Sequence, residues 1–147
     1  MNETAAQHAF DNAMATHEPV FEKFFLARLL GLEFTYEAEQ CAVTFEAKDF
    51  MFNPQGTLHG GIIATVMDIS MGHLLKHVDG PAATLEMKTQ YVKAAGIGKF
   101  TCTGAFIQRG RGTSFLKSTL TNERGEVVAF ATATWKLLKP KATEAPA

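Results

Sequence analysis

The longest apolar stretch of the chain, residues 60–77, most constrains how the protein can fold. Its sequence is GGIIATVMDISMGHLLKH. At about 100° of rotation per residue, its Ile, Val, Met and Leu side chains cover most of the circumference of a helix. A helix that is apolar all round is buried. Asp68, His73, Lys76 and His77 interrupt the stretch, so no uninterrupted apolar run reaches the roughly 18 residues that a membrane span needs. We therefore expect the rest of the chain to surround this helix.

The remaining sequence supplies mainly strands. Four runs with the composition and alternation of strands follow the helix, at residues 84–92, 99–108, 113–122 and 127–138. Two shorter pieces precede it and meet at an irregularity near Glu39–Gln40. Because the last three runs are joined by short glycine-bearing turns, they predict an antiparallel meander. The fold class is thus α+β, with one long antiparallel sheet wrapped around one central helix.

The N-terminal part of the chain contains a second helical pattern. Pro19 favours a first helical turn and Gly31 the residue just past a helix, and apolar residues between them recur at helical spacing. We predict an amphipathic helix there. Residues 1–17 form a short helix or a loose arm, residues 18–138 a single domain, and residues 139–147 a mobile tail.

Composition narrows the class of protein. A chain of 147 residues has the size of one domain, and 46% hydrophobic residues suffice for a core. A net charge of -1 without a basic run argues against nucleic-acid binding and electrostatic docking on membranes. No signal-peptide pattern is present. The two cysteines, Cys41 and Cys102, lie in strand-like segments and indicate reduced core thiols in a cytoplasmic protein.

Asp68 is the exception within the apolar helix. An unpaired, ionised carboxylate in buried surroundings is strongly unfavourable, so such a group needs a partner or a chemical role. In the first alternative, Asp68 binds a neighbouring hydroxyl or amide and only orients the helix. In the second, it is a catalytic group.

Two glycines at the start of the helix offer a possible counterpart. Gly60 and Gly61 let a ligand approach their N–H groups at the positive end of the helix, where an anion or a polarised carbonyl oxygen binds well. The alternative is a flexible turn. Gly60 and Asp68 are eight residues apart, or roughly 12 Å along the axis, too far to contact one carbonyl. A two-fold dimer with antiparallel central helices would bring them together.

The stretch from Asn53 to Gly72, NPQGTLHGGIIATVMDISMG, closely resembles the signature of the hotdog-fold thioesterases. The resemblance is to the branch around the phenylacetate-pathway and human-type acyl-CoA thioesterases. That signature has an Asn, a short glycine-bearing loop, His-Gly-Gly, six residues and then Asp. Here it is matched by Asn53, Gly56, His59 to Gly61, and Asp68.

The resemblance implies a fold, an assembly and a reaction. The fold is a sheet wrapped around one helix, paired into a homodimer with a continuous sheet, and two dimers commonly form a homotetramer. The reaction is hydrolysis of acyl-CoA thioesters without a metal or a bound cofactor, coenzyme A being part of the substrate. Asp68 of one subunit would be the general base or nucleophile. The Gly60 amide and Asn53 would come from the other subunit. Thr84, seven residues before Tyr91, would help to hold the water.

Several other residues have two possible roles each. His59 is a base or, more simply, a support that packs on the loop carrying Asn53. Arg109 and Arg111, in the turn RGRG, are phosphate ligands for coenzyme A or part of a solvated turn. Phe52, next to Asn53, lines the acyl site or belongs to the core, and Gly61 is a further candidate for substrate binding. His73 and His77, near the C-terminal end of the helix, are predicted to be capping or surface residues.

Two other functions fit the same pattern. A hotdog hydratase or dehydratase would use His59 with Asp68 of the partner subunit. A non-catalytic binding module would hold an acyl-CoA as a sensor. No His, Cys or Asp spacing indicates a zinc site, and no G-x-S-x-G nucleophile motif occurs. The acyl group, and the choice between coenzyme A and acyl-carrier-protein esters, stay open.

Overall fold

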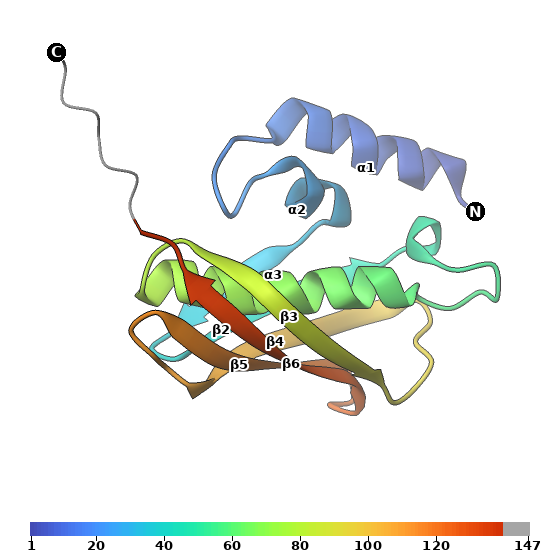
Figure 1. Ribbon diagram of the computed structural model, residues 1–147. Helices are drawn as coiled ribbons and strands as arrows, with labels where there is room; N and C mark the ends of the chain where they lie inside the picture. The colour runs from blue at the N-terminus through green and yellow to red at the C-terminus, as the bar shows by residue number, and fades with distance from the viewer. Residues whose placement is uncertain (140–147) are drawn as a thin grey trace, which may run out of the picture.

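The computed structural model describes residues 1–139, which form a sheet, a central helix and two N-terminal helices (Figure 1). Six antiparallel strands form one sheet in the order β1-β2-β4-β5-β6-β3. The elements are α1 (Glu3–Thr16), α2 (Phe25–Leu30), β1 (Glu33–Glu37), β2 (Gln40–Ala47), the short 3₁₀ helix η1 (Asp49–Met51), α3 (Gly60–Val78), β3 (Ala82–Tyr91), β4 (Gly98–Gln108), β5 (Thr113–Asn122) and β6 (Val127–Leu137).

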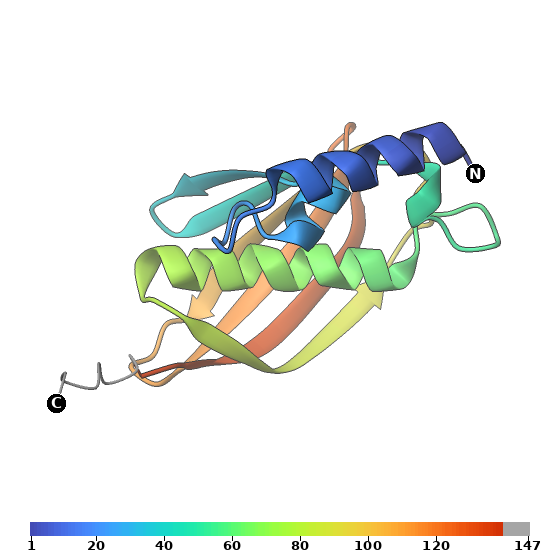
Figure 2. The ribbon, with the colours of Figure 1, turned by 90° about the horizontal axis from the view of Figure 1, so that it is seen from above.

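The sheet curves around α3, which confirms the predicted architecture (Figures 1 and 2). The predicted central helix and all four strands after it are present, with bounds that differ by at most two residues. The meander β4-β5-β6 is confirmed, and β3 pairs with the outer side of β6. Strand β3 is therefore an edge strand, and its outer edge is unpaired in the single chain.

The sheet covers only part of the central helix. The side chains of α3 that face the sheet are buried, among them Val66, Met67, Met71 and Leu74. The N-terminal helices lie on the other side of α3 (Figures 1 and 2). Between them and β3, one stripe of α3 stays only half covered, and it includes Thr65, Asp68 and Gly72. This stripe is where the site described below lies.

The prediction of an amphipathic helix from Pro19 onward is wrong for the first half of that segment. Residues 19–24 form turns, and the helix covers only Phe25–Leu30 before Gly31, which has a φ of 65°. The turn is closed by the Glu18 and Lys23 amides, which donate to the Lys23 and Val20 carbonyls. We call residues 19–24 the aromatic segment. Its aromatic residues have helical spacing because they cover α3.

Both cysteines lie in the core as free thiols, as predicted. Cys102 on β4 contacts the Ser118 hydroxyl at 3.0 Å, and Ser118 in turn contacts the Ser70 hydroxyl of α3 at 2.8 Å. Burial raises the pKa of the Cys102 thiol to about 11 and that of Cys41 to about 12. Both thiols are therefore protonated at neutral pH and shielded from reagents.

Gly104 on β4 allows α3 to lie directly against the sheet. A Cβ atom at this position would come within 2.6 Å of the Ser70 carbonyl oxygen, which belongs to the helix backbone and cannot move aside alone. We expect Gly104→Ala to lower the free energy of unfolding by about 1–3 kcal/mol, the usual effect of overpacking a core. Chemical denaturation measures this change. Gly96→Ala, where a Cβ would meet open space, is the matched control; equal losses in the two variants would contradict this account of the packing.

No helix within residues 1–139 is both long and apolar enough to cross a membrane. Apart from Lys139, the tail predicted to be mobile lies outside the described residues.

Candidate active site

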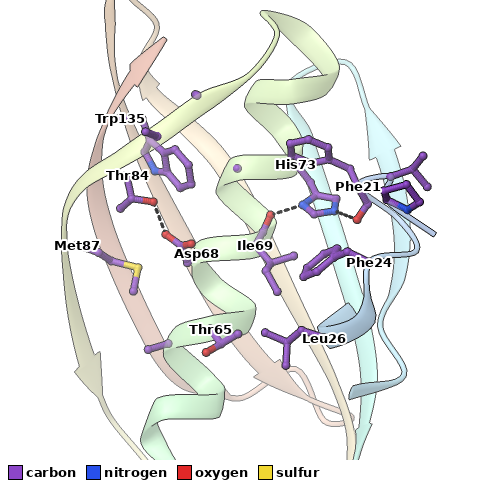
Figure 3. A pocket seen from close by; sticks show the side chains of 16 residues that line it. Phe21, Phe24, Leu26, Thr65, Asp68, Ile69, His73, Thr84, Met87 and Trp135 are labelled. Carbon is purple, nitrogen blue, oxygen red and sulfur yellow. Dashed lines mark hydrogen bonds between the residues drawn. The ribbon is translucent and has the colours of Figure 1, made fainter. Parts of the chain in front are cut away.

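Asp68 projects from the half-covered stripe of α3 into a cavity of about 840 Å³ (Figure 3). The cavity is a trough whose floor is α3, with β3 along one side and the aromatic segment and α2 along the other. The expectation that Asp68 is fully buried is therefore wrong, since its side chain is half-buried at the edge of this space. The α3 helix still holds the carboxylate in an almost entirely apolar environment.

Strand β3 brings the predicted partner to Asp68. The Thr84 hydroxyl donates a hydrogen bond of 2.7 Å to Oδ1 of Asp68. The register of β3 against β6 shifts between Thr84 and Glu86, directly after this residue. Within residues 1–139, Oδ2 of Asp68 has no hydrogen-bond partner. One carboxylate oxygen is thus fixed by Thr84, and the other is available to a water molecule or a substrate.

The N-terminus of α3 offers one amide donor rather than the two expected. His59 is the N-cap residue, and its Nδ1 accepts a hydrogen bond of 2.8 Å from the Gly61 amide. The expectation of a free Gly61 N–H is therefore wrong. Among the described residues the Gly60 amide makes no hydrogen bond, so it is the donor left at the positive end of the helix.

Gly60 and Asn53 border a second, smaller cavity of about 260 Å³. Tyr91, at the end of β3, lies over Gly60 and donates a 2.8 Å hydrogen bond to its carbonyl oxygen. The Asn53 side chain is engaged within its own loop: it donates to the Thr57 hydroxyl and accepts from the Gln55 and Thr57 amides. Its amide group therefore shapes the loop that leads into α3, a role that the sequence did not reveal.

The two cavities share no residue. Asp68 and Thr84 line the larger one, whereas Asn53 and Gly60 line the smaller one. Eight helical residues separate Gly60 from Asp68, which is roughly 12 Å along α3. Within one chain, the Asp68 carboxylate and the Gly60 amide therefore belong to separate cavities.

His73 is buried, and the prediction that it is a surface or capping residue is wrong. Only 4% of it is exposed. Its Nε2 lies 2.6 Å from the Phe21 carbonyl oxygen and its Nδ1 3.0 Å from that of Ile69, while Phe34 stacks on the ring at 4.3 Å. Burial lowers the pKa of His73, and the two carbonyl contacts partly oppose that shift. His77, by contrast, is exposed as predicted and stacks on Tyr36.

Three further candidates lie away from both cavities. Arg109, in the β4–β5 hairpin, forms an ion pair with Asp79 at the end of α3, with two Nε–carboxylate distances of 3.0 and 2.9 Å. Arg111 is exposed on the same hairpin. Phe52 is half-buried, packs against the core and forms a β-bridge with Leu58. The structure does not bring these residues to Asp68.

Sequence reasoning missed several residues that line the larger cavity. Gly72 and Trp135 lie at one end of it, and Phe21 and Phe24 cover it. Two features could have indicated them. Gly72 follows Asp68 by four residues and therefore shares its helical face, and Trp135 is the only tryptophan of the chain. Residues 1–139 contain no cluster of three or more His, Cys, Asp or Glu side chains that could hold a metal ion.

One antiparallel sheet curved around a central helix is the hotdog fold that the sequence predicted. Comparison with known families agrees. The family model of the thioesterase superfamily matches residues 55–129, about half of the chain. The chain belongs to this superfamily and is a thioester hydrolase.

Individual relatives give the same picture. The chain is 27% identical over 127 residues to the medium/long-chain acyl-CoA thioesterase YigI of Escherichia coli K12, covering 74% of this chain and 82% of YigI. The crystal structure of smu.793 from Streptococcus mutans, bound to acetyl-CoA, is similar with a TM-score of 0.70 and 30% identity, over 76% of this chain and 91% of that one. PaaI of E. coli shares the fold, with a TM-score of 0.77 and 19% identity over 91% and 96% of the two chains.

Proposed function

We propose that the protein hydrolyses acyl-CoA thioesters to a free carboxylic acid and coenzyme A. The observation that carries the proposal is the Asp68 carboxylate, which faces an apolar cavity of about 840 Å³ with one oxygen bound by Thr84 and the other free. The similarity to YigI, described as a medium/long-chain acyl-CoA thioesterase, supports an acyl-CoA substrate. So does the acetyl-CoA bound to smu.793.

In the proposed reaction, Asp68 activates water. As the water oxygen attacks the thioester carbon, its proton passes to the carboxylate. The tetrahedral intermediate then collapses, the C–S bond breaks, and the proton is returned to the leaving thiolate of coenzyme A. General base catalysis of this kind contributes typically ~10²–10⁴-fold. Direct attack by Asp68, which forms a mixed anhydride that water then cleaves, uses the same geometry and stays the alternative.

The negative charge that develops on the thioester oxygen needs a donor, and we assign this role to the Gly60 amide. An oriented backbone N–H at a helix N-terminus stabilises such an oxyanion well. Because Gly60 and Asp68 of one chain are too far apart to act together, the donor would come from a partner subunit. The unpaired edge of β3 supports pairing into a continuous sheet, with Asn53 shaping the loop that carries the donor. Two such dimers would form the tetramer that the resemblance implies.

We further propose that the reaction uses neither a metal nor a bound cofactor. Coenzyme A enters only as part of the substrate. Arg111, which is exposed, is the better candidate of the two hairpin arginines for its phosphates, because Arg109 is already paired with Asp79.

The geometry at His59 disfavours the hydratase alternative. Nδ1 of His59 accepts the Gly61 N–H, so in the neutral ring the proton lies on Nε2 and no lone pair is free to act as a base. His59 instead supports the start of the helix whose first amide is the proposed oxyanion donor.

A panel of thioesters with free-thiol detection tests the proposal. We expect thiol release from acyl-CoA substrates and no hydration of an enoyl-CoA. The assay suits this protein, since Cys41 and Cys102 are buried and add little thiol signal in the folded state. Hydration of the enoyl-CoA would favour the hydratase, and tight acyl-CoA binding without turnover would favour a binding module.

A further inference from the structure

The cavity beside Asp68 is asymmetric along α3, and this asymmetry bears on where the acyl chain lies. The residues of α3 that line it run from Ala64 to His73, so Asp68 is near the middle. Toward the N-terminus of α3 the lining consists of a few residues, among them Thr65, Leu26 and Met87. Toward the C-terminus more residues line it, among them Phe21, His73 and Trp135.

Small residues flank the C-terminal part of the cavity. Gly72 lies one helical turn beyond Asp68, roughly 6 Å along the axis, and Ala82 and Ala83 begin β3 beside it. Trp135 closes this end: a Cβ atom at Gly72 would come within 2.8 Å of its ring. The indole therefore rests directly on the helix and forms an apolar end wall.

The aromatic segment is the roof of this part, and several contacts hold it in place. The Phe21 carbonyl oxygen is bound by His73, and the Tyr36 hydroxyl donates a 2.7 Å hydrogen bond to Glu22. Phe24 packs near the His73 ring, with the ring centroids 6.1 Å apart. The matched family residues begin at 55, so this roof lies outside the part of the chain that the family model describes.

Apart from Asp68, the polar side chains of the lining have no hydrogen-bond donor left for a substituent of the acyl chain. The two ring nitrogens of His73 face backbone carbonyls, the Thr84 hydroxyl binds Asp68, and the Thr65 hydroxyl donates to the Gly61 carbonyl. Nε1 of Trp135 has no hydrogen-bond partner but is covered by other atoms. A carboxylate or phosphate placed there would lose its hydration without compensation.

We propose that the acyl chain of the substrate runs from Asp68 toward Trp135 beneath the aromatic segment, and that Phe24 and Trp135 set its length. The substrate class is accordingly an acyl chain without an anionic substituent, of a length that Trp135 limits. A cavity of about 840 Å³ has the size of typical small-molecule sites. This inference rests on the proposed thioesterase function.

A chain-length series tests the role of Phe24. Straight-chain acyl-CoA esters from short to long are compared by kcat/KM in wild type and Phe24→Ala. Removing the Phe24 ring should raise kcat/KM for long chains relative to that for shorter chains at least ~10-fold. This is the scale on which an apolar pocket discriminates between neighbouring chain lengths. Phe115→Ala on the exposed face of β5 is the matched control and should keep the wild-type profile. An unchanged profile in Phe24→Ala would overturn the assignment of Phe24.

Trp135 provides a second measurement that needs no turnover. Because it is the only tryptophan, the fluorescence of the protein reports on this end of the cavity. An S-alkyl coenzyme A thioether cannot be hydrolysed, and a bromine near the end of its alkyl chain quenches an indole that it contacts. We expect loss of Trp135 fluorescence with the terminal bromine and much less with the bromine on the third carbon from sulfur.

The two possible failures are distinguishable. If the thioether inhibits hydrolysis competitively but neither bromine position quenches Trp135, the chain lies elsewhere and the inference is overturned although the thioesterase function stands. If wild type releases no thiol from any ester, the proposed function itself fails and the inference fails with it.

Discussion

Replacing Asp68 with asparagine is expected to lower kcat for the best thioester substrate at least ~100-fold. Asparagine has the shape of the carboxylate but can neither accept a proton from water nor attack the thioester. Its Oδ1 can still accept the hydrogen bond from Thr84, so the free energy of unfolding should change little. Steady-state kinetics with free-thiol detection and a denaturation curve measure the two quantities.

Two further variants make this result specific. Asp11→Asn on α1, where the carboxylate binds only Gln7, is the matched control and should retain full activity. Thr84→Ser keeps the hydroxyl that binds Asp68, and Thr84→Val removes it, so only the second should lower kcat. Wild-type turnover by Asp68→Asn would show that the carboxylate merely orients the helix.

Mixed oligomers should regain activity that neither parent variant has, because we propose that each site draws on two chains. The second parent is Gly60→Pro, which removes the proposed oxyanion donor and nothing else from the helix. Gly60 is the first residue of α3, where proline is well tolerated, and His59 before it has the extended backbone that proline requires. We expect Gly60→Pro alone to lose ~10²-fold or more in kcat.

The expected recovery follows from the geometry. After unfolding and joint refolding of equal amounts, half of the dimers are mixed, and each mixed dimer holds one intact site, so activity should reach about one quarter of wild type. Gly60→Ala crowds Tyr91 in the same way but keeps the N–H, and it is the control for Gly60→Pro. Mixed dimers without recovered activity would mean that no site is shared between subunits.

The sheet and the central helix could be predicted because their patterns are local. Alternation in the strands and the apolar circumference of α3 do not depend on distant parts of the chain. The resemblance also placed Thr84 near the water at Asp68, and in the structure its hydroxyl contacts the carboxylate directly. The aromatic segment was wrongly predicted to be helical. Its apolar residues cover α3 from a turn, but their spacing along the sequence is the same as that of residues on one face of a helix.

The predictions that were wrong at the site have a common physical cause. In each case the environment of a residue depends on a contact that its local sequence pattern does not reveal. His73 is polar and close to a helix end, but the Phe21 carbonyl, 52 residues away, binds it inside the protein. The Gly61 amide seemed free until the His59 ring was seen to accept it. The half-burial of Asp68 depends on a cavity whose wall comes from the N-terminal segment, which no periodicity within α3 could reveal.

The contact of α3 with Gly104 has an evolutionary consequence. The helix backbone at Ser70, two residues from Asp68, is positioned by β4 beneath it, whereas the roof of the proposed acyl cavity comes from the opposite side of the helix. Substitutions in that roof can therefore change which acyl chains fit while the carboxylate stays where the sheet places it. Substrate preference can diverge among relatives that retain one chemistry, and the determinants of that divergence are to be sought in the N-terminal segment.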